Sequence, residues 1–282
     1  MTGKSNRMGG RIARQALRAA PIPEDEKPVR PGLSGGRYQP LTQDEVSRIH
    51  EAALEVLETI GFANALPSCV ELVTQAGGSL TDDGRLLFPR SLIEDTLARC
   101  ARNITLYGQD SRFDLHLSGS RTYFGTAGAA VHVVDTVKRE YRESTAQDLY
   151  DAARIVDQME HIHFFQRSMV LRDIEDPAEM DFNTCYAAVA GTSKHVGTSF
   201  VDPAHVDQAM QMLEMIAGSE QAWRERPFVS CSCCFVVPPM RFAEDACRVL
   251  EACVRHGMPV LLLAAGQAGA TSPASLAGAG SG

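Results

Sequence analysis

The chain has 282 residues, 44% hydrophobic and 22% charged, which is enough to bury the core of one large domain or two modest ones. A formal net charge of −8 argues against nucleic acid as the main partner, because a phosphate-binding surface needs clustered Lys and Arg. The longest apolar runs are only strand-sized, so we expect no membrane span. Eight cysteines without a secretory signal indicate a reducing compartment, and we expect a cytoplasmic protein.

The first 36 residues differ in composition from the rest of the chain. They are rich in Gly and Pro, and their basic residues outnumber Glu24, Asp25 and Glu26. We predict a disordered basic arm over 1–36; a transit peptide is the alternative, because the segment is rich in Arg and has no acid before Glu24.

The next part, 37–125, reads as a mixed α+β region. Thr42 with Glu45 forms the capping-box pattern, and Gly61 supplies a left-handed stop, so we predict a helix between them. Further helices are predicted over 68–76 and 91–100. Short strands are predicted over 85–88, 104–107, 113–117 and 121–124.

From residue 126 strands alternate with capped helices. Strands are predicted over 131–134, 162–170, 196–201, 228–237 and 260–264, with helices after Thr145, Pro177, Pro203 and Pro239. This alternation indicates parallel strands joined by right-handed crossovers. A (β/α)8 TIM barrel needs roughly 250 residues, so we expect 126–282 to hold only the first part of one, incomplete in this chain. A doubly wound sheet is the alternative.

In parallel α/β folds the working residues follow the carboxyl ends of the strands. This rule makes a small set of side chains candidates for the site. They are Gln166, Arg167, Ser168, Thr198, Ser199, Cys233, Cys234 and Gln267.

Metal ligation is the less favoured reading of the His and Cys patterns. His161 and His163 alternate and could share an ion, yet they lie at the amino end of their strand, before 164–170, which is the wrong end for a barrel mouth. Cys231 and Cys233 lack partner ligands at a recognisable spacing and are expected to be small buried residues, so we predict no metal site. Lys194-His195 could bind an anion or lie at the solvated end of the barrel. These patterns alone lead no further than a barrel-type enzyme.

Several stretches resemble the trimethylamine methyltransferase family. They are 41–62, 84–89, 123–125 with 131–135, Lys194-His195 and 266–278. The resemblance implies a (β/α)8 barrel that moves a methyl group from a methylated amine to the cobalt of a separate corrinoid protein. Cobalamin would then be carried by that partner and not bound directly by this chain, and a homo-oligomer is expected. Members use pyrrolysine and trimethylamine, or lack pyrrolysine and use quaternary amines such as glycine betaine; the pyrrolysine region lies beyond this chain.

An ammonium substrate suggests roles for some residues. Aromatic faces attract a quaternary ammonium, so Tyr123 and Phe124 are predicted to form a substrate-binding wall. Gln166, Ser199, Cys233 and Gln267 are further substrate-binding candidates because they follow strands, and no catalytic residue is assigned. The alternatives are a metal-dependent barrel hydrolase that uses His161 and His163, and a fragment without catalysis of its own.

Overall fold

The computed structural model describes residues 33–35, 38–264 and 266–275. The predicted arm, 1–36, lies outside the described residues except for 33–35, where Leu33–Ser34 (β1) pairs antiparallel with Arg121–Thr122 (β7). No helix in the described part of the chain is long and apolar enough to cross a membrane.

Parallel strands in chain order form the centre of the fold. They are β10 (Phe164–Gln166), β11 (His195–Thr198), β12 (Val229–Val237) and β14 (Val260–Ala264). Parallel bridges from Gly125 to Phe164 and from Ala130 to Met169 add the segment 125–130 beside β10. The protein therefore has a mixed α/β fold built on a parallel sheet.

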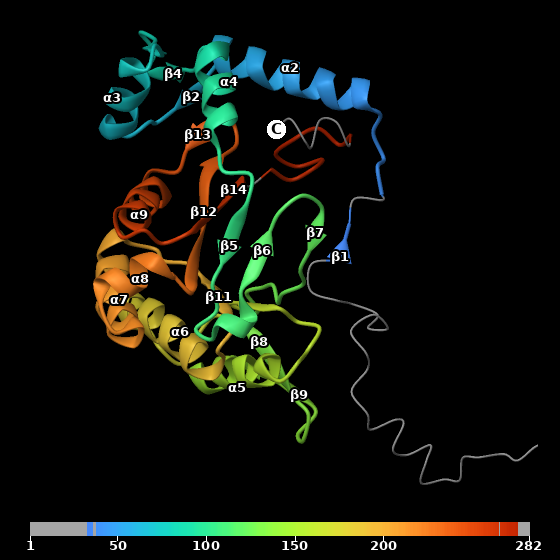
Figure 1. Ribbon diagram of the computed structural model, residues 1–282, viewed down its shortest axis with the longest axis vertical. Coiled ribbons are helices and arrows are strands. Elements are labelled where there is room, and N and C mark those ends of the chain that lie inside the picture. The colour runs from blue at the N-terminus through green and yellow to red at the C-terminus, as the bar shows by residue number, and fades with distance from the viewer. Residues whose placement is uncertain (1–32, 36–37, 265, 276–282) are drawn as a thin grey trace, which may run out of the picture.

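The connecting helices lie on one side of this sheet. They are α5 (Ala146–Asp157), α6 (Pro177–Gly191), α7 (Pro203–Ala217), α8 (Glu220–Glu225) and α9 (Glu244–Arg255). Figure 1 shows them along the lower and left borders, outside the strands. Each new parallel strand is added on the same side of the last, so right-handed crossovers place every helix on one face. The described strands contain no reversal of the kind that a doubly wound sheet requires; closure into a barrel stays a prediction.

The helices begin where short-range signals predict. Thr145 and Asp148 form a capping box at α5, and Asp176 and Asp202 cap α6 and α7 just before a first-turn proline. The helix predicted to open at Pro239 is the exception, because α9 begins only at Glu244. The intervening residues instead contain a cis bond at Pro238-Pro239 and strand β13 (Arg241–Phe242).

The segment predicted as the first barrel strand, 131–134, is also assigned differently. His132–Asp135 (β8) pairs antiparallel with Glu140–Glu143 (β9) in a hairpin. The place beside β10 is taken by 125–130 instead. The apolar valines predicted a strand correctly, but only the pairing decides which sheet a strand joins.

The N-terminal region joins the same sheet as the parallel strands. Its elements are α2 (Gln43–Thr59), β2 (Phe62–Ala63), α3 (Pro67–Gln75), β3 (Ser79–Leu80), β4 (Arg85–Leu87), α4 (Arg90–Arg99), β5 (Ile104–Leu106), η1 (Ser111–Phe113) and β6 (Leu115–Leu117). The predicted Thr42–Glu45 capping box at α2 is confirmed. Strand β13 pairs with both β12 and β2, so β2, β4 and β3 continue the sheet of the parallel strands.

The main core fills the space between the parallel strands and the helices. Phe165, Val196, Val229 and Cys231 are fully buried on the helix-facing side of neighbouring strands. Because strand side chains alternate, residues one position away face the other side of the sheet. We call this other side the inner face, and it carries the polar residues described next.

Candidate functional site

A polar pair lies on the inner face toward the carboxyl ends of β10 and β12. The strand register aligns Gln166 with Gly197 and Gly197 with Ser230, so their side chains share one face. The Gln166 amide Nε2 donates a hydrogen bond of 3.1 Å to Oγ of Ser232, across β11. Both side chains are half-buried, and this hydrogen bond does not use the side-chain oxygen Oε1 of Gln166.

Gly197 makes room for the Gln166 side chain. A Cβ at position 197 would lie 1.8 Å from Oε1 of Gln166, far inside any real contact, so the amide rests directly on the glycine backbone. Thr126 fixes the same residue from the other side, because its hydroxyl donates to the backbone carbonyl oxygen of Gln166 at 2.5 Å. The position of Gln166 is therefore set by three neighbouring parallel segments.

The small residues after Thr126 allow this segment to pack closely against the neighbouring strand segment. A Cβ on Gly128 would lie 2.5 Å from the Ser168 carbonyl oxygen, and Ala130 N donates to that same oxygen at 2.9 Å. The backbone that approaches Gly128 closely is thus the neighbouring strand segment.

The other strand-end candidates differ in their surroundings. Ser199 is half-buried directly after β11, and Gln267 is exposed in the turn after β14, where its backbone N–H donates to the Thr271 hydroxyl. Cys233 lies apart from Gln166, because its buried thiol donates to the Ala246 carbonyl oxygen on α9 at 3.0 Å. Burial raises the pKa of the Cys233 thiol to about 11, so it stays protonated and faces the helices.

Tyr123 and Phe124 lie at the opposite end of the sheet. Gly125 is in register with the first residue of β10, so both aromatics precede the amino end of the parallel strands. Their rings contact His163, with centroids 5.7 and 6.2 Å from the imidazole, and the Phe124 N–H donates to Nδ1 of His163. The predicted aromatic wall therefore does not face Gln166, because the strand begins at 125 and not at 131.

Lys194 and His195 are buried near the amino ends, and both sequence readings of this pair are wrong. Lys194 Nζ donates to the carbonyl oxygens of Val156, Met159 and Ile162 at 2.7, 2.6 and 2.6 Å, which uses its three protons. Burial lowers the pKa of His195 to about 4, and its ring nitrogens pair with the Tyr107 carbonyl and the Ser230 hydroxyl. Neither side chain can bind an anion, and neither lies in solvent.

The described residues contain no cluster of metal ligands of the kind that a metal-dependent hydrolase would need. No group of three or more His, Cys, Asp or Glu side chains among them is placed to hold a metal ion. Nδ1 of His163 already accepts the Phe124 N–H.

An apolar cavity that the sequence did not predict lies at the carboxyl ends of β12 and β14. Its volume is about 440 Å³, and its walls include Val56 and Leu57 of α2, Phe62, Phe235 and Met240. No charged side chain is among its lining residues. The apolar face of α2 was visible in the sequence, but the strand ends it covers are far away in the chain.

Comparison with known proteins identifies the family. The model of the trimethylamine methyltransferase (MTTB) family matches residues 7–281. The chain belongs to the trimethylamine methyltransferase family. The predicted resemblance is thus confirmed over nearly the whole sequence.

The curated relatives that this chain matches are about twice as long as the chain. Trimethylamine methyltransferase MttB of Desulfitobacterium hafniense (strain DSM 10664 / DCB-2) is 29% identical over 248 residues, 88% of this chain and 49% of that protein. The glycine betaine methyltransferase of Desulfitobacterium hafniense (strain Y51) is 23% identical over 245 residues, 86% of this chain and 50% of that protein. The chain therefore spans about half the length of these relatives.

A solved structure is also similar to this family member. The crystal structure of the hydroxylamine MtmB complex aligns with a TM-score of 0.38 and 10% identity, over 78% of this chain and 49% of that one. A TM-score that low assigns no fold.

Proposed function

We propose that the protein acts in methyl transfer from a small methylated amine, either trimethylamine or a quaternary amine such as glycine betaine. The acceptor is the cobalt of a corrinoid carried by a separate protein. Family membership supports the reaction class, and the relatives named above are methyltransferases for these two kinds of amine. The same-sided order of the parallel strands supports a (β/α)8 barrel in the complete enzyme.

The observation that carries the proposal is the Gln166–Ser232 pair above Gly197. It lies toward the carboxyl ends of parallel strands, where β/α enzymes bind their substrates. The Gln166 amide oxygen presents partial negative charge without a full charge, which suits a cationic ammonium that must leave as a neutral amine. Ser199 follows β11 and Gln267 follows β14, the two strands on either side of β12, and both residues stay candidates for the same substrate site.

The corrinoid supplies a nucleophilic metal when its protein is docked, so this chain need not supply a nucleophile. Its own residues have to bind the amine, hold one methyl group in line and exclude water. The uncharged cavity beside the strand ends suits this task, since the rings of Phe62 and Phe235 can face an ammonium group. These two rings take over the role that the sequence suggested for Tyr123 and Phe124.

The test uses the protein encoded by the complete reading frame, a corrinoid protein reduced to Co(I), and trimethylamine or glycine betaine as donor. Methylcobalamin formation is followed by absorbance. Gln166→Ala should lower the rate about tenfold or more, because one oriented polar contact is worth about 1.4 kcal/mol. Gln147→Ala, an exposed change on α5, is the matched control.

A second variant separates orientation from loss of the amide. Gly197→Ala keeps Gln166 but displaces it, since the new Cβ would overlap Oε1. We expect a similar fall in rate with the fold retained by circular dichroism. No methylcobalamin from either donor with the unchanged protein would refute the proposed function; full activity in both variants would refute the assigned site.

A further inference from the structure

Arg85 on β4 connects two segments that are remote in the sequence and that meet at the apolar cavity. Its Nε donates to the carbonyl oxygen of Ile60 at 2.7 Å, and its Nη2 donates to those of Gly61 at 2.8 Å and Met240 at 3.3 Å. Figure 1 shows α2, β2 and β4 together at the top of the molecule, above β13. One half-buried guanidinium thus joins the end of α2 to the loop 238–240.

On the first segment the Arg85 side chain acts as a remote cap for α2. The last turn of α2 contains no basic residue, and the final carbonyl oxygens of a helix have no partner within it. Arg85 donates to the oxygens of Ile60 and Gly61, directly after the last helical residue. Gly61, with a φ of +61°, turns the chain from the helix into β2. Arg85 therefore holds the peptide group that precedes Phe62.

On the second segment Arg85 holds the loop before β13. Met240 has a φ of +51°, a left-handed conformation that a residue other than glycine keeps only when its surroundings hold it. Its carbonyl oxygen accepts the N–H of Ala63 at 3.0 Å as well as the Arg85 contact. Pro238, Pro239 and Met240 all line the cavity. The two hydrogen bonds thus hold one wall of the cavity against β2.

The aromatic rings of the cavity lie beside this junction. Phe62 packs against Phe242 with ring centroids 5.0 Å apart, and Phe235 contacts the same ring at 6.4 Å. A cation is attracted to an aromatic face only within about 6 Å of the ring centroid, so a small displacement of Phe62 weakens the attraction. Arg85 is not among the residues that line the cavity, so any effect on a ligand has to pass through its neighbours.

We propose that Arg85 is a positioning residue of the amine site. By holding the peptide group before Phe62 and the loop 238–240 together, it sets the spacing of the cavity walls and thereby the affinity for an ammonium group. This inference rests on the proposed function, because it takes the cavity as the place where the amine binds.

The first test measures ammonium binding without a corrinoid protein. Tetramethylammonium chloride is titrated calorimetrically into the protein encoded by the complete reading frame. Arg85→Met keeps the apolar stem of the side chain but removes its donors, and we expect Kd to rise about tenfold. Arg99→Met is the matched control on α4, where Arg99 donates only to the Asp95 carbonyl oxygen of the same helix within the described residues. Its Kd should equal that of the unchanged protein.

Kinetics with trimethylamine or glycine betaine separate positioning from stability. A variant that only folds less well contains less active protein, which lowers the apparent kcat and leaves KM unchanged. Positioning predicts the opposite, a KM raised about tenfold with kcat within about threefold of the unchanged protein. Arg85→Lys keeps the charge at the end of α2 but loses the planar fork, so it should fold and raise KM less, about threefold.

A double-mutant cycle tests whether Arg85 acts through Phe62. Phe62→Leu should itself raise the Kd for tetramethylammonium, and adding Arg85→Met should then change Kd by less than about twofold. Fully additive effects overturn the proposal. So do an unchanged Kd and KM in both Arg85 variants, a lower kcat alone, or no binding of tetramethylammonium to the unchanged protein. If the unchanged protein still forms methylcobalamin, these results leave the proposed function standing.

Discussion

At the scale of single residues, two adjacent buried side chains brace the amino ends of the parallel strands. Lys194 satisfies three carbonyl oxygens at the end of α5 and the loop after it, and His195 joins the Tyr107 carbonyl to the Ser230 hydroxyl on β12. Because Nδ1 of the neutral imidazole donates to the carbonyl, Nε2 accepts the Ser230 hydroxyl proton. Both residues are structural, and each has a measurable signature.

Replacing Lys194 should strongly destabilise the fold. Lys194→Met keeps the length of the side chain but leaves the inward carbonyl oxygens of Met159 and Ile162 without their lysine donor, while that of Val156 keeps the Met159 N–H; the change should cost about 3 kcal/mol or more. Lys138→Met is the control, since that side chain is 68% exposed and its loss should cost less than about 0.5 kcal/mol. Urea unfolding measures the free energy of unfolding of both variants. Equal losses in the two variants would contradict this account.

His195 should make stability depend on pH. Burial lowers its pKa from 6.5 to about 4, so the unfolded chain binds a proton first as the pH falls. The contribution is present above pH 6.5 and is lost progressively toward pH 4, with about 2 kcal/mol lost between pH 7 and pH 5. The change His195→Gln should flatten this part of the curve measured by urea unfolding at several pH values. An unchanged slope would exclude His195 as its source.

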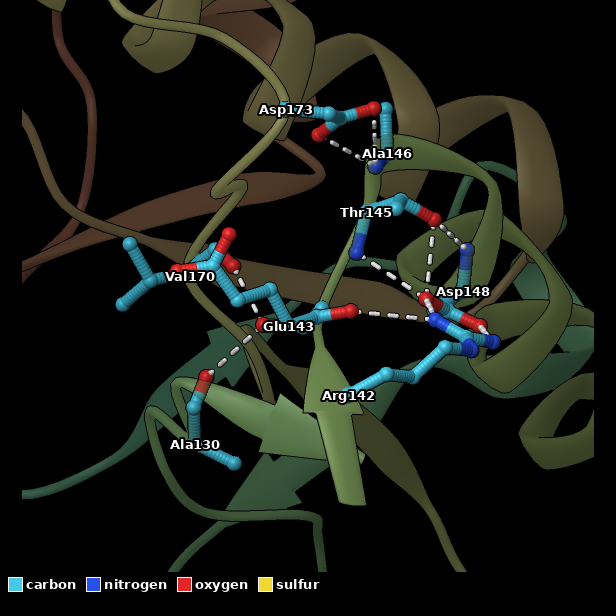
Figure 2. Close-up of polar contacts among 9 residues, drawn as sticks. Ala130, Arg142, Glu143, Thr145, Ala146, Asp148, Val170 and Asp173 are labelled. Carbon is cyan, nitrogen blue, oxygen red and sulfur yellow. Dashed lines mark hydrogen bonds and ion pairs between the residues drawn. The ribbon is translucent and has the colours of Figure 1, made fainter. Parts of the chain in front are cut away.

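At the scale of elements, the junction of β9 and α5 depends on one carboxylate. Asp148 accepts the backbone N–H and the hydroxyl of Thr145 at 2.9 and 2.8 Å and pairs with Arg142, as Figure 2 shows. The Arg142 guanidinium, followed by the Thr145 hydrogen bonds, lowers the pKa of Asp148 to about 2 against the effect of burial. One side chain thus completes the capping box of the helix and pairs with the hairpin.

Asp148→Ala should remove both functions at once. We expect a loss of about 1–3 kcal/mol, since the carboxylate half of the capping box and a partly buried ion pair are lost together. Asp151→Ala is the matched control on the same helix, because Asp151 has only an exposed contact with Arg154 at 3.6 Å. The midpoint temperatures of thermal unfolding of the two variants are compared with that of the unchanged protein. A control as unstable as Asp148→Ala would show that the helix, and not its cap, is sensitive.

At the scale of the whole molecule, the parallel sheet is unevenly protected. Every residue of β11 is buried, whereas Leu261, Leu262 and Leu263 of β14 are 40–53% exposed. Among the described residues β14 pairs only with β12. Leucines on both faces are typical of a strand covered on both sides, so β14 has the composition of an interior strand and the exposure of an edge.

This difference should appear in native-state hydrogen exchange. Amides of β11 should exchange near the global unfolding limit, and those of β14 about 100-fold faster, because edge strands open locally. Both strands are read in the same sample by mass spectrometry, so β11 serves as the internal reference. Equal protection of the two strands would mean that β14 is covered in solution.

The parts that could be predicted from the sequence are those with local causes. Helix capping involves atoms within three residues of each other, so the sequence predicts where these helices start. The capping residues are Thr42, Thr145, Asp176 and Asp202. The spacing of strands and helices likewise predicted a parallel α/β sheet. The start of α9 was missed because Pro238-Pro239 belongs to a turn held by β2, which is remote in the chain.

What the sequence alone determined is therefore the family of the chain, the alternation of parallel strands and helices from β10 onward, and the short list of strand-end residues. Only the tertiary structure decided that Gln166 meets Ser232, that Cys233 faces α9, and that Tyr123 and Phe124 lie at the far end. The physical reason is register. Contacts between distant residues decide which strands pair and which side of the sheet each side chain faces. If a strand begins at a different residue, the nearby side chains move to the other end of the sheet or to its other face.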